Sequence, residues 1–186
     1  YAPAQTPIQS PTTSNGFVIF DSDYYDNGGV AGAFGTGLHP ANGTYMGTIT
    51  SPSINFSSYP NLTLKFNSYY REYTGIAKVA FSIDGGLTYT DTIEVHPEIN
   101  VNEETNPDHV VIINLPSNIC GQSSVNIQFI YDATVLYGSY YGYYFWMIDD
   151  IEIYETPDHF ISLESYSSSG SINSSLFSGR GQNYTF

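Results

Sequence analysis

Clustered carboxylates are the side chains in this sequence best suited to chemistry. The stretch 21–29 holds Asp21, Asp23 and Asp26, followed by Asn27 and two glycines. Carboxylate and amide oxygens on a flexible loop can surround a hard cation such as Ca²⁺, which prefers oxygen ligands. The acidic spacing and the lack of flanking helical patterns do not match an EF-hand. A solvated turn is the alternative explanation, because Asp, Asn and Gly also dominate turns.

A second acidic element lies in the stretch 145–154. Strict two-residue alternation predicts one strand face that is apolar except for a single carboxylate and consists of Phe145, Met147, Asp149, Ile151 and Ile153. A buried carboxylate costs much free energy unless it is paired or bound to a metal. We therefore expect Asp149 to bind a cation, with Asp150 as a weaker candidate because a β-bulge would exchange their faces. The alternative is an aspartate that accepts backbone N–H bonds at a sheet edge.

A tyrosine-rich run forms the third candidate site. The stretch 137–144 holds five tyrosines among glycine and serine. Exposed tyrosine rings can stack on sugar faces while their hydroxyls form hydrogen bonds, at a small cost in side-chain entropy. Tyr140, Tyr141 and Tyr143 are therefore candidate ligand-binding residues, with aromatic packing in the core as the alternative.

Catalytic signals are weak. Neither G-x-S-x-G nor H-E-x-x-H occurs, and the lone Cys120 has no evident partner. The four histidines are scattered without metal-ligand spacing, and we expect them on the surface: His39, His96, His109 and His159. We predict that the protein is not an enzyme.

Composition narrows the class of partner. The chain has 186 residues, with 18 acidic and four basic side chains and a net charge of -14. Such a charge excludes nucleic acid and anionic membrane surfaces as partners and favours cations. No apolar run reaches the ~20 residues that a membrane-spanning helix needs. A single cysteine permits no intrachain disulfide, and the excess of Tyr, Ser, Thr, Asn and Gly over Lys and Arg indicates an extracellular protein.

Apolar residues recur with a period of two along most of the chain, which is typical of half-buried strands. Eight strands are predicted, near 17–20, 44–49, 62–66, 79–83, 89–95, 110–115, 125–131 and 143–154. Between two of these strands, Asp84, Gly85 and Gly86 predict a hairpin turn. An all-β, antiparallel two-sheet jelly-roll β-sandwich is the expected fold.

The sequence divides into three predicted parts. Residues 1–15 form an extended segment rich in Pro, Ser and Thr, interpreted as the remainder of a truncated first-strand region. Residues 16–157 form the sandwich. Residues 158–186 form a linker and the start of a following module, which we expect to be immunoglobulin-like.

An ordered series of motifs resembles a known family. The motifs are 15–17, 20–23, 51–54, 64–66, 82–86 and 146–151, and together they resemble the MAM-like, cleaved-adhesin and choice-of-anchor jelly-roll domains of secreted Bacteroidetes proteins. The resemblance implies a jelly roll supported by Ca²⁺, with Asp21, Asp23 and Asp149 as metal ligands and Asp26, Asn27 and Asp150 as weaker ones. Related domains open with a further strand bearing a Trp, which residues 1–14 do not supply.

The resemblance also implies the function. It predicts a non-catalytic, calcium-stabilised adhesion or carbohydrate-binding module of a secreted or cell-surface bacterial protein. Its partners would be a cell-surface or environmental polysaccharide and, for a secretion cargo, the type IX secretion machinery. It would bind no nucleic acid and insert into no membrane. The alternatives are a structural spacer or passenger domain of a larger type IX cargo protein, and an accessory to a glycosidase or protease.

Overall fold

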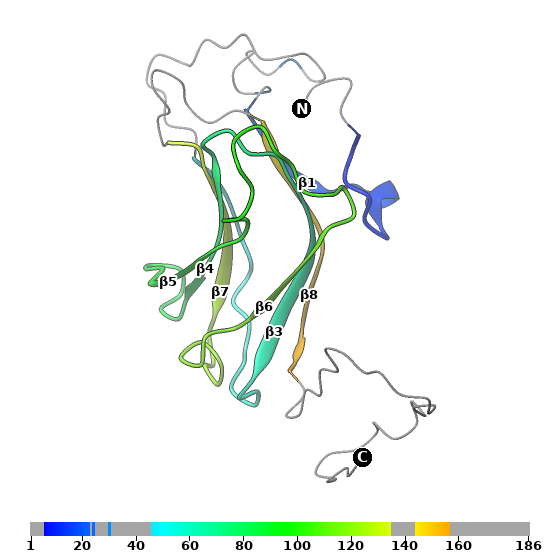
Figure 1. Cartoon of the computed structure of the whole chain (residues 1–186). Coiled ribbons are helices and arrows are strands. Elements are labelled where there is room, and N and C mark those ends of the chain that lie inside the picture. Colours follow the sequence, from blue (N-terminus) through cyan, green and yellow to red (C-terminus); the bar gives the residue numbers. More distant parts are fainter. Residues whose placement is uncertain (1–5, 23, 25–29, 31–45, 135–143, 157–186) are drawn as a thin grey trace, which may run out of the picture.

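The computed structural model describes residues 6–22, 24, 30, 46–134 and 144–156 of the chain. These residues form eight strands in two antiparallel sheets of four strands each, preceded by the short 3-10 helix η1 (Thr13–Asn15) (Figure 1). The strands are β1 (Val18–Asp21), β2 (Met46–Thr50), β3 (Leu62–Tyr70), β4 (Ile76–Ser82), β5 (Asp91–Glu94), β6 (Val110–Asn114), β7 (Asn126–Asp132) and β8 (Phe145–Glu155). The all-β prediction is confirmed, and each observed strand overlaps a predicted one.

The strand order is that of a jelly roll. One sheet runs β1-β8-β3-β6 and the other β2-β7-β4-β5. Antiparallel pairs are therefore nested, with β1 on β8, β2 on β7, β3 on β6 and β4 on β5. The first four strands therefore pair with the last four in reverse order, and most neighbours within each sheet are distant in sequence.

The main core lies between the two sheets and centres on Trp146, whose side chain is fully buried. The ring of Phe20 stacks on it at a centroid distance of 5.6 Å, and Phe129 packs at 6.1 Å. Phe66 meets Phe129 edge to face at 5.2 Å, an arrangement that aromatic quadrupoles favour. Each such buried side chain contributes roughly 1.5–3 kcal/mol through the hydrophobic effect.

The predicted hairpin turn is present between β4 and β5. The Asp84 carboxylate accepts hydrogen bonds from the Ser82 hydroxyl at 2.7 Å and from the Thr88 hydroxyl at 2.6 Å. These two bonds lead the interactions that hold the pKa of Asp84 well below its usual range. The strand predicted near 79–83 ends one residue earlier, because Ile83 lies in the turn and is 47% exposed.

A second, smaller core covers the outer face of the β1-β8-β3-β6 sheet. Ile8 is completely buried there against Tyr69, Phe145 and Met147. The backbone N–H of Gln9 donates to the Pro107 carbonyl at 2.8 Å, so the N-terminal segment 6–17 also bonds to the β5–β6 connection. Consequently the first half of β8 is buried on both faces.

A β-bulge interrupts β8 at Asp150. Lys65 pairs with Glu152 and Asn67 with Asp149, so three residue steps on β8 match two steps on β3. Asp150 has a positive φ of 49°, which accommodates the extra residue. One extra residue reverses the side-chain alternation beyond it.

The prediction that the five alternate residues from Phe145 to Ile153 share one face of β8 is therefore wrong. Phe145 and Met147 contact Ile8 on the outer side of the sheet. Ile151 and Ile153, beyond the bulge, point toward the other sheet and face Phe129.

Candidate functional site

Two of the predicted sites emerge from the same end of the sandwich. β1 ends at Asp21 and β8 begins at Phe145, and these two residues pair directly. The acidic stretch that follows Asp21 and the tyrosine run that precedes Phe145 are therefore attached to neighbouring strand ends. Most of their predicted ligands lie outside the described residues, namely Asp23, Asp26, Asn27, Tyr140, Tyr141 and Tyr143.

The structure does not bring Asp21 and Asp149 together. Asp149 lies four residues beyond Phe145 along β8, which separates it from Asp21 by ~13 Å along the strands at ~3.3 Å per residue. Calcium ligands lie only ~2.4 Å from the ion, so one ion cannot bind both carboxylates in this register. Asp21 instead accepts a hydrogen bond from the backbone N–H of Tyr24 at 3.3 Å.

Asp149 and Asp150 form a compact group of oxygens with the N-terminal segment. The Ser10 hydroxyl donates to Asp149 at 2.5 Å, and the Thr12 hydroxyl donates to Asp150 at 2.6 Å. The backbone N–H of Asp150 donates to the other Asp149 oxygen at 2.9 Å. The bulge thus directs two consecutive carboxylates toward one short stretch of chain.

One oxygen of this group lacks a partner. Oδ2 of Asp150 is buried and has no hydrogen bond among the described residues. Neither carboxylate forms an ion pair there, since the three described basic side chains pair elsewhere: Lys65 with Glu152 at 3.1 Å, Lys78 with Asp132 at 2.8 Å and Arg71 with Glu104 at 3.8 Å. Two adjacent carboxylates without a basic partner suit an external cation with a preference for oxygen.

The fit to Ca²⁺ is partial. No group of three or more His, Cys, Asp or Glu side chains that could hold a metal occurs within the described ranges. A calcium ion takes six to eight oxygen ligands. Asp149 and Asp150 would supply the carboxylates, and Ser10, Thr12 and water the remaining oxygens.

A second group of residues lies at the end of the sandwich where β1, β3, β5 and β7 terminate. We call this the loop end, and it comprises the described residues 71–75, 95–109 and 144. The guanidinium of Arg71 lies 4.1 Å above the ring of Tyr144, and Tyr73 meets the same ring edge to face at 6.0 Å. The Tyr144 hydroxyl donates to the Asn102 side-chain oxygen at 2.9 Å. An aromatic ring, an amide and a guanidinium are therefore held together by three separate chain segments.

Backbone strain is concentrated at these two places. Within the described ranges, four residues other than glycine have a positive φ: Thr74, Asn102, Tyr144 and Asp150. The first three lie at the loop end and the fourth at the β8 bulge. Such conformations cost on the order of 1–3 kcal/mol each for most residues and gather at functional sites.

A half-buried carboxylate also lies at the loop end. Glu72 accepts the backbone N–H of Thr74 at 2.5 Å, while its Oε2 is buried and has no hydrogen-bond partner in the part of the chain that the structure describes. Burial raises the pKa of Glu72. No sequence motif indicated Arg71, Tyr73, Asn102 or Glu72, because these residues come from loops that only the strand pairing brings together.

A Ser–His pair lies in the core rather than in a cleft. Trp146 Nε1 donates to the Ser68 hydroxyl oxygen at 2.8 Å, so the Ser68 hydroxyl is free to donate to His96 Nε2, at 2.7 Å. The prediction of a surface position for His96 is wrong, because this residue is only 3% exposed. Ser68 is completely buried, so substrate has no access to this pair.

Comparison with known proteins assigns no family. No protein-family model matches the chain, and no curated protein matches it. Over the described part of the chain, no helix is long and apolar enough to cross a membrane.

Proposed function

We propose that the protein is a non-catalytic, calcium-stabilised adhesion or carbohydrate-binding module, with its glycan site at the loop end. The observation that carries the proposal is the contact of Tyr144 with Arg71, Tyr73 and Asn102 in strained loops. The resemblance of the sequence motifs to those of secreted Bacteroidetes jelly rolls supports export to the outer cell surface, as cargo of the type IX secretion machinery.

The chemistry of the loop end suits a sugar. Sugars present apolar C–H faces that pack on aromatic rings, and hydroxyls that bond to amides and charged groups. Tyr73 and Tyr144 supply rings, while Asn102 and Glu104 are exposed and supply polar groups. Since the Asn102 bond and the Arg71 contact already fix the Tyr144 ring, little side-chain entropy is lost when a ligand binds.

Charge selects among glycans. With a net charge of -14, the protein repels polyanionic polysaccharides at long range. Uncharged glycans and those containing amino sugars are therefore the class of ligand that we expect. Tyr140, Tyr141 and Tyr143 precede Tyr144 in the sequence and remain candidate ligand-binding residues, outside the described part of the chain.

Calcium has a structural role in this proposal. Bound at Asp149 and Asp150, the ion would neutralise the two carboxylates and hold the segment containing Ser10 and Thr12 against β8. It would stabilise the fold and take part in no reaction.

A glycan array probed with the full chain tests the proposal. We expect binding to uncharged or amino-sugar glycans, and a loss of at least about tenfold in affinity for Tyr144→Ala. Asn102→Gly should also weaken binding, because it removes the amide while glycine still accepts the positive φ.

Tyr59→Ala is the matched control. Tyr59 is 43% exposed and precedes the opposite end of β3, away from the loop end. Binding that is equally sensitive to Tyr59→Ala and Tyr144→Ala would contradict the proposed location. A chain that binds no glycan but is stabilised by Ca²⁺ would instead be a structural spacer.

A further inference from the structure

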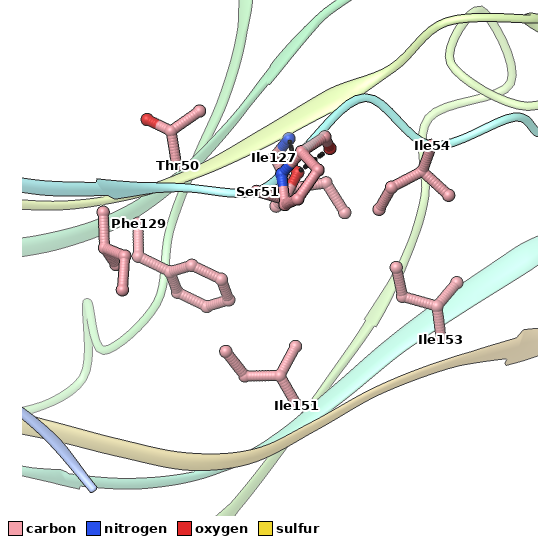
Figure 2. A pocket seen from close by; sticks show the side chains of 9 residues that line it. Thr50, Ser51, Ile54, Ile127, Phe129, Ile151 and Ile153 are labelled. Carbon is pink, nitrogen blue, oxygen red and sulfur yellow. Dashed lines mark hydrogen bonds between the residues drawn. The ribbon is translucent and has the colours of Figure 1, made fainter.

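An apolar cleft of about 260 Å³ opens between the two sheets, away from the loop end. Figure 2 shows Ile151 and Ile153 of β8 on one side, with Ile54, Ile127 and Phe129 on the other. The polar contribution to the lining comes from Thr50 and Ser51 at its margin. The bulge at Asp150 gives the cleft an apolar side on β8, because Ile151 and Ile153 beyond it point toward the other sheet.

Strand edges border the cleft on both sides. β2 is the outermost strand of its sheet. β1 pairs only with residues 145–148 of β8, so from Asp149 to Tyr154 the strand has a described ladder partner on its β3 side alone. An edge of this kind presents backbone N–H and C=O groups that can pair with another strand.

Apolar side chains are exposed along these edges. Ile151 is 48% exposed, and Ile49 of β2 is 38% exposed. An exposed apolar patch beside two strand edges has the features of a site for strand addition, in which backbone bonds supply affinity and pockets accept alternate side chains.

Charge identifies the kind of strand. β2, β7 and β8 carry five carboxylates and no basic residue, but two of these carboxylates, Asp132 and Glu152, already pair with Lys78 and Lys65 of the neighbouring strands. The chain as a whole still has a large excess of acidic groups, with a net charge of -14. A second copy of this chain would bring like charges together, since each copy has a net charge of -14. A strand with basic flanks would complement them.

We propose that an extended segment of another protein, with alternating apolar side chains and basic flanking residues, adds to β8 over residues 149–154, on the edge that has no strand partner among the described residues. Its alternate side chains enter the cleft between Ile151 and Ile49. The inference is independent of glycan binding, because the cleft and the loop end share no residue.

Fluorescence anisotropy with a short labelled peptide tests this proposal. The probe is a peptide of alternating valine and threonine with a lysine pair at each end, titrated with the full chain at low salt. Saturable binding is expected, with a loss of at least tenfold for Ile151→Asp because a carboxylate would enter the apolar cleft. A peptide with a central proline should bind at least tenfold more weakly, because proline lacks the N–H that pairs with an edge.

Ile112→Asp is the matched control. Ile112 is 62% exposed on β6, the opposite edge strand of the same sheet. Lysine flanks attract any acidic surface, so a peptide that binds Ile151→Asp as tightly as the wild type would overturn the proposal. Absence of peptide binding would also overturn it, as would strong hydrogen-exchange protection on this edge of β8 without peptide, which would show that the chain itself covers the edge.

Discussion

Ser10 and Asp149 are joined by a hydrogen bond of 2.5 Å, although they lie 139 positions apart in the sequence. This bond attaches the segment before β1 to the bulge of β8. It also gives Asp149 a polar partner on a sheet face that carries Phe145 and Met147. The N-terminal segment is therefore part of the folded unit, and its removal would expose both an apolar face and a carboxylate.

Removing the Ser10 hydroxyl should destabilise the protein. A hydrogen bond to a charged group contributes about 1.5–3 kcal/mol, so we expect Ser10→Ala to lower the free energy of unfolding by about that amount. Urea denaturation measures the change. Ser53→Ala removes an exposed hydroxyl that bonds to Ser124 at 2.8 Å and should cost less than about 1 kcal/mol. Equal losses for the two substitutions would show that the Ser10 bond contributes no more to stability than an exposed hydrogen bond does.

Truncation of Ile8 should have a larger effect. This side chain is completely buried against Tyr69, Phe145 and Met147, so Ile8→Ala leaves a cavity. We expect a loss of about 2–4 kcal/mol by the same measurement. Val110→Ala, at a position 40% exposed on β6, should change stability by less than about 1 kcal/mol. An Ile8→Ala protein as stable as the wild type would mean that the N-terminal segment is detached in solution.

The buried His96 predicts a pH dependence. Burial, reinforced by the nearby His109, lowers the pKa of His96 from 6.5 to about 4. Between these pH values the unfolded chain binds a proton that the folded protein does not. Stability should therefore fall as the pH drops from about 6.5 to about 4, by up to about 3 kcal/mol.

Urea denaturation across this pH range, on the wild type and on His96→Gln, measures the effect. The groups that face His96 are Ser68, Tyr70, Glu98 and His109, and they remain in the variant. The variant should show a flatter pH profile. Identical slopes in both proteins would assign the pH dependence to other groups.

Calcium should stabilise the full chain. Ligand linkage predicts ~2.7 kcal/mol when free Ca²⁺ is a hundredfold above its Kd, which corresponds to a rise of roughly 5–10 °C in melting temperature. Magnesium should substitute poorly, because it requires tight octahedral coordination. Thermal melts in Ca²⁺ and in EDTA measure this difference.

Two variants locate the ion. Asp149→Asn should abolish the calcium effect if the ion lies at the β8 bulge. Asp21→Asn should abolish it if the ion lies in the acidic loop after β1. An unchanged wild-type midpoint in EDTA, after verified metal removal, would rule out a stabilising calcium site.

Local patterns predicted the strands well. Leu62, Leu64 and Phe66 alternate with polar residues because one face of their strand contacts the core. The same holds for Val125, Ile127 and Phe129. Such a face can be predicted because all its residues lie within one short stretch of sequence. The pairing of Asp84 with Gly85 and Gly86 likewise marks a turn, because the residues that need a positive φ are adjacent in the sequence.

The candidate sites depend on contacts that no local pattern encodes. The bulge at Asp150 appears in the register between β8 and β3. The residues of β8 alone do not show where this register shifts. Ser10 was not identified because a hydroxyl in a Pro/Ser/Thr-rich segment has no feature that specifies a partner on β8. Asn102 and Tyr144 meet only because two loops lie at the same end of the sandwich.

The most direct test of the glycan-binding proposal is an NMR titration of the isotopically labelled full chain with an uncharged oligosaccharide selected from the array. We predict that the amide signals that shift on binding belong to residues 71–75, 100–104 and 144, and that Tyr144→Ala removes these shifts without changing the rest of the spectrum. Shifts concentrated around Ile151 and Ile49, or no shifts at saturating oligosaccharide, would contradict a glycan site at the loop end.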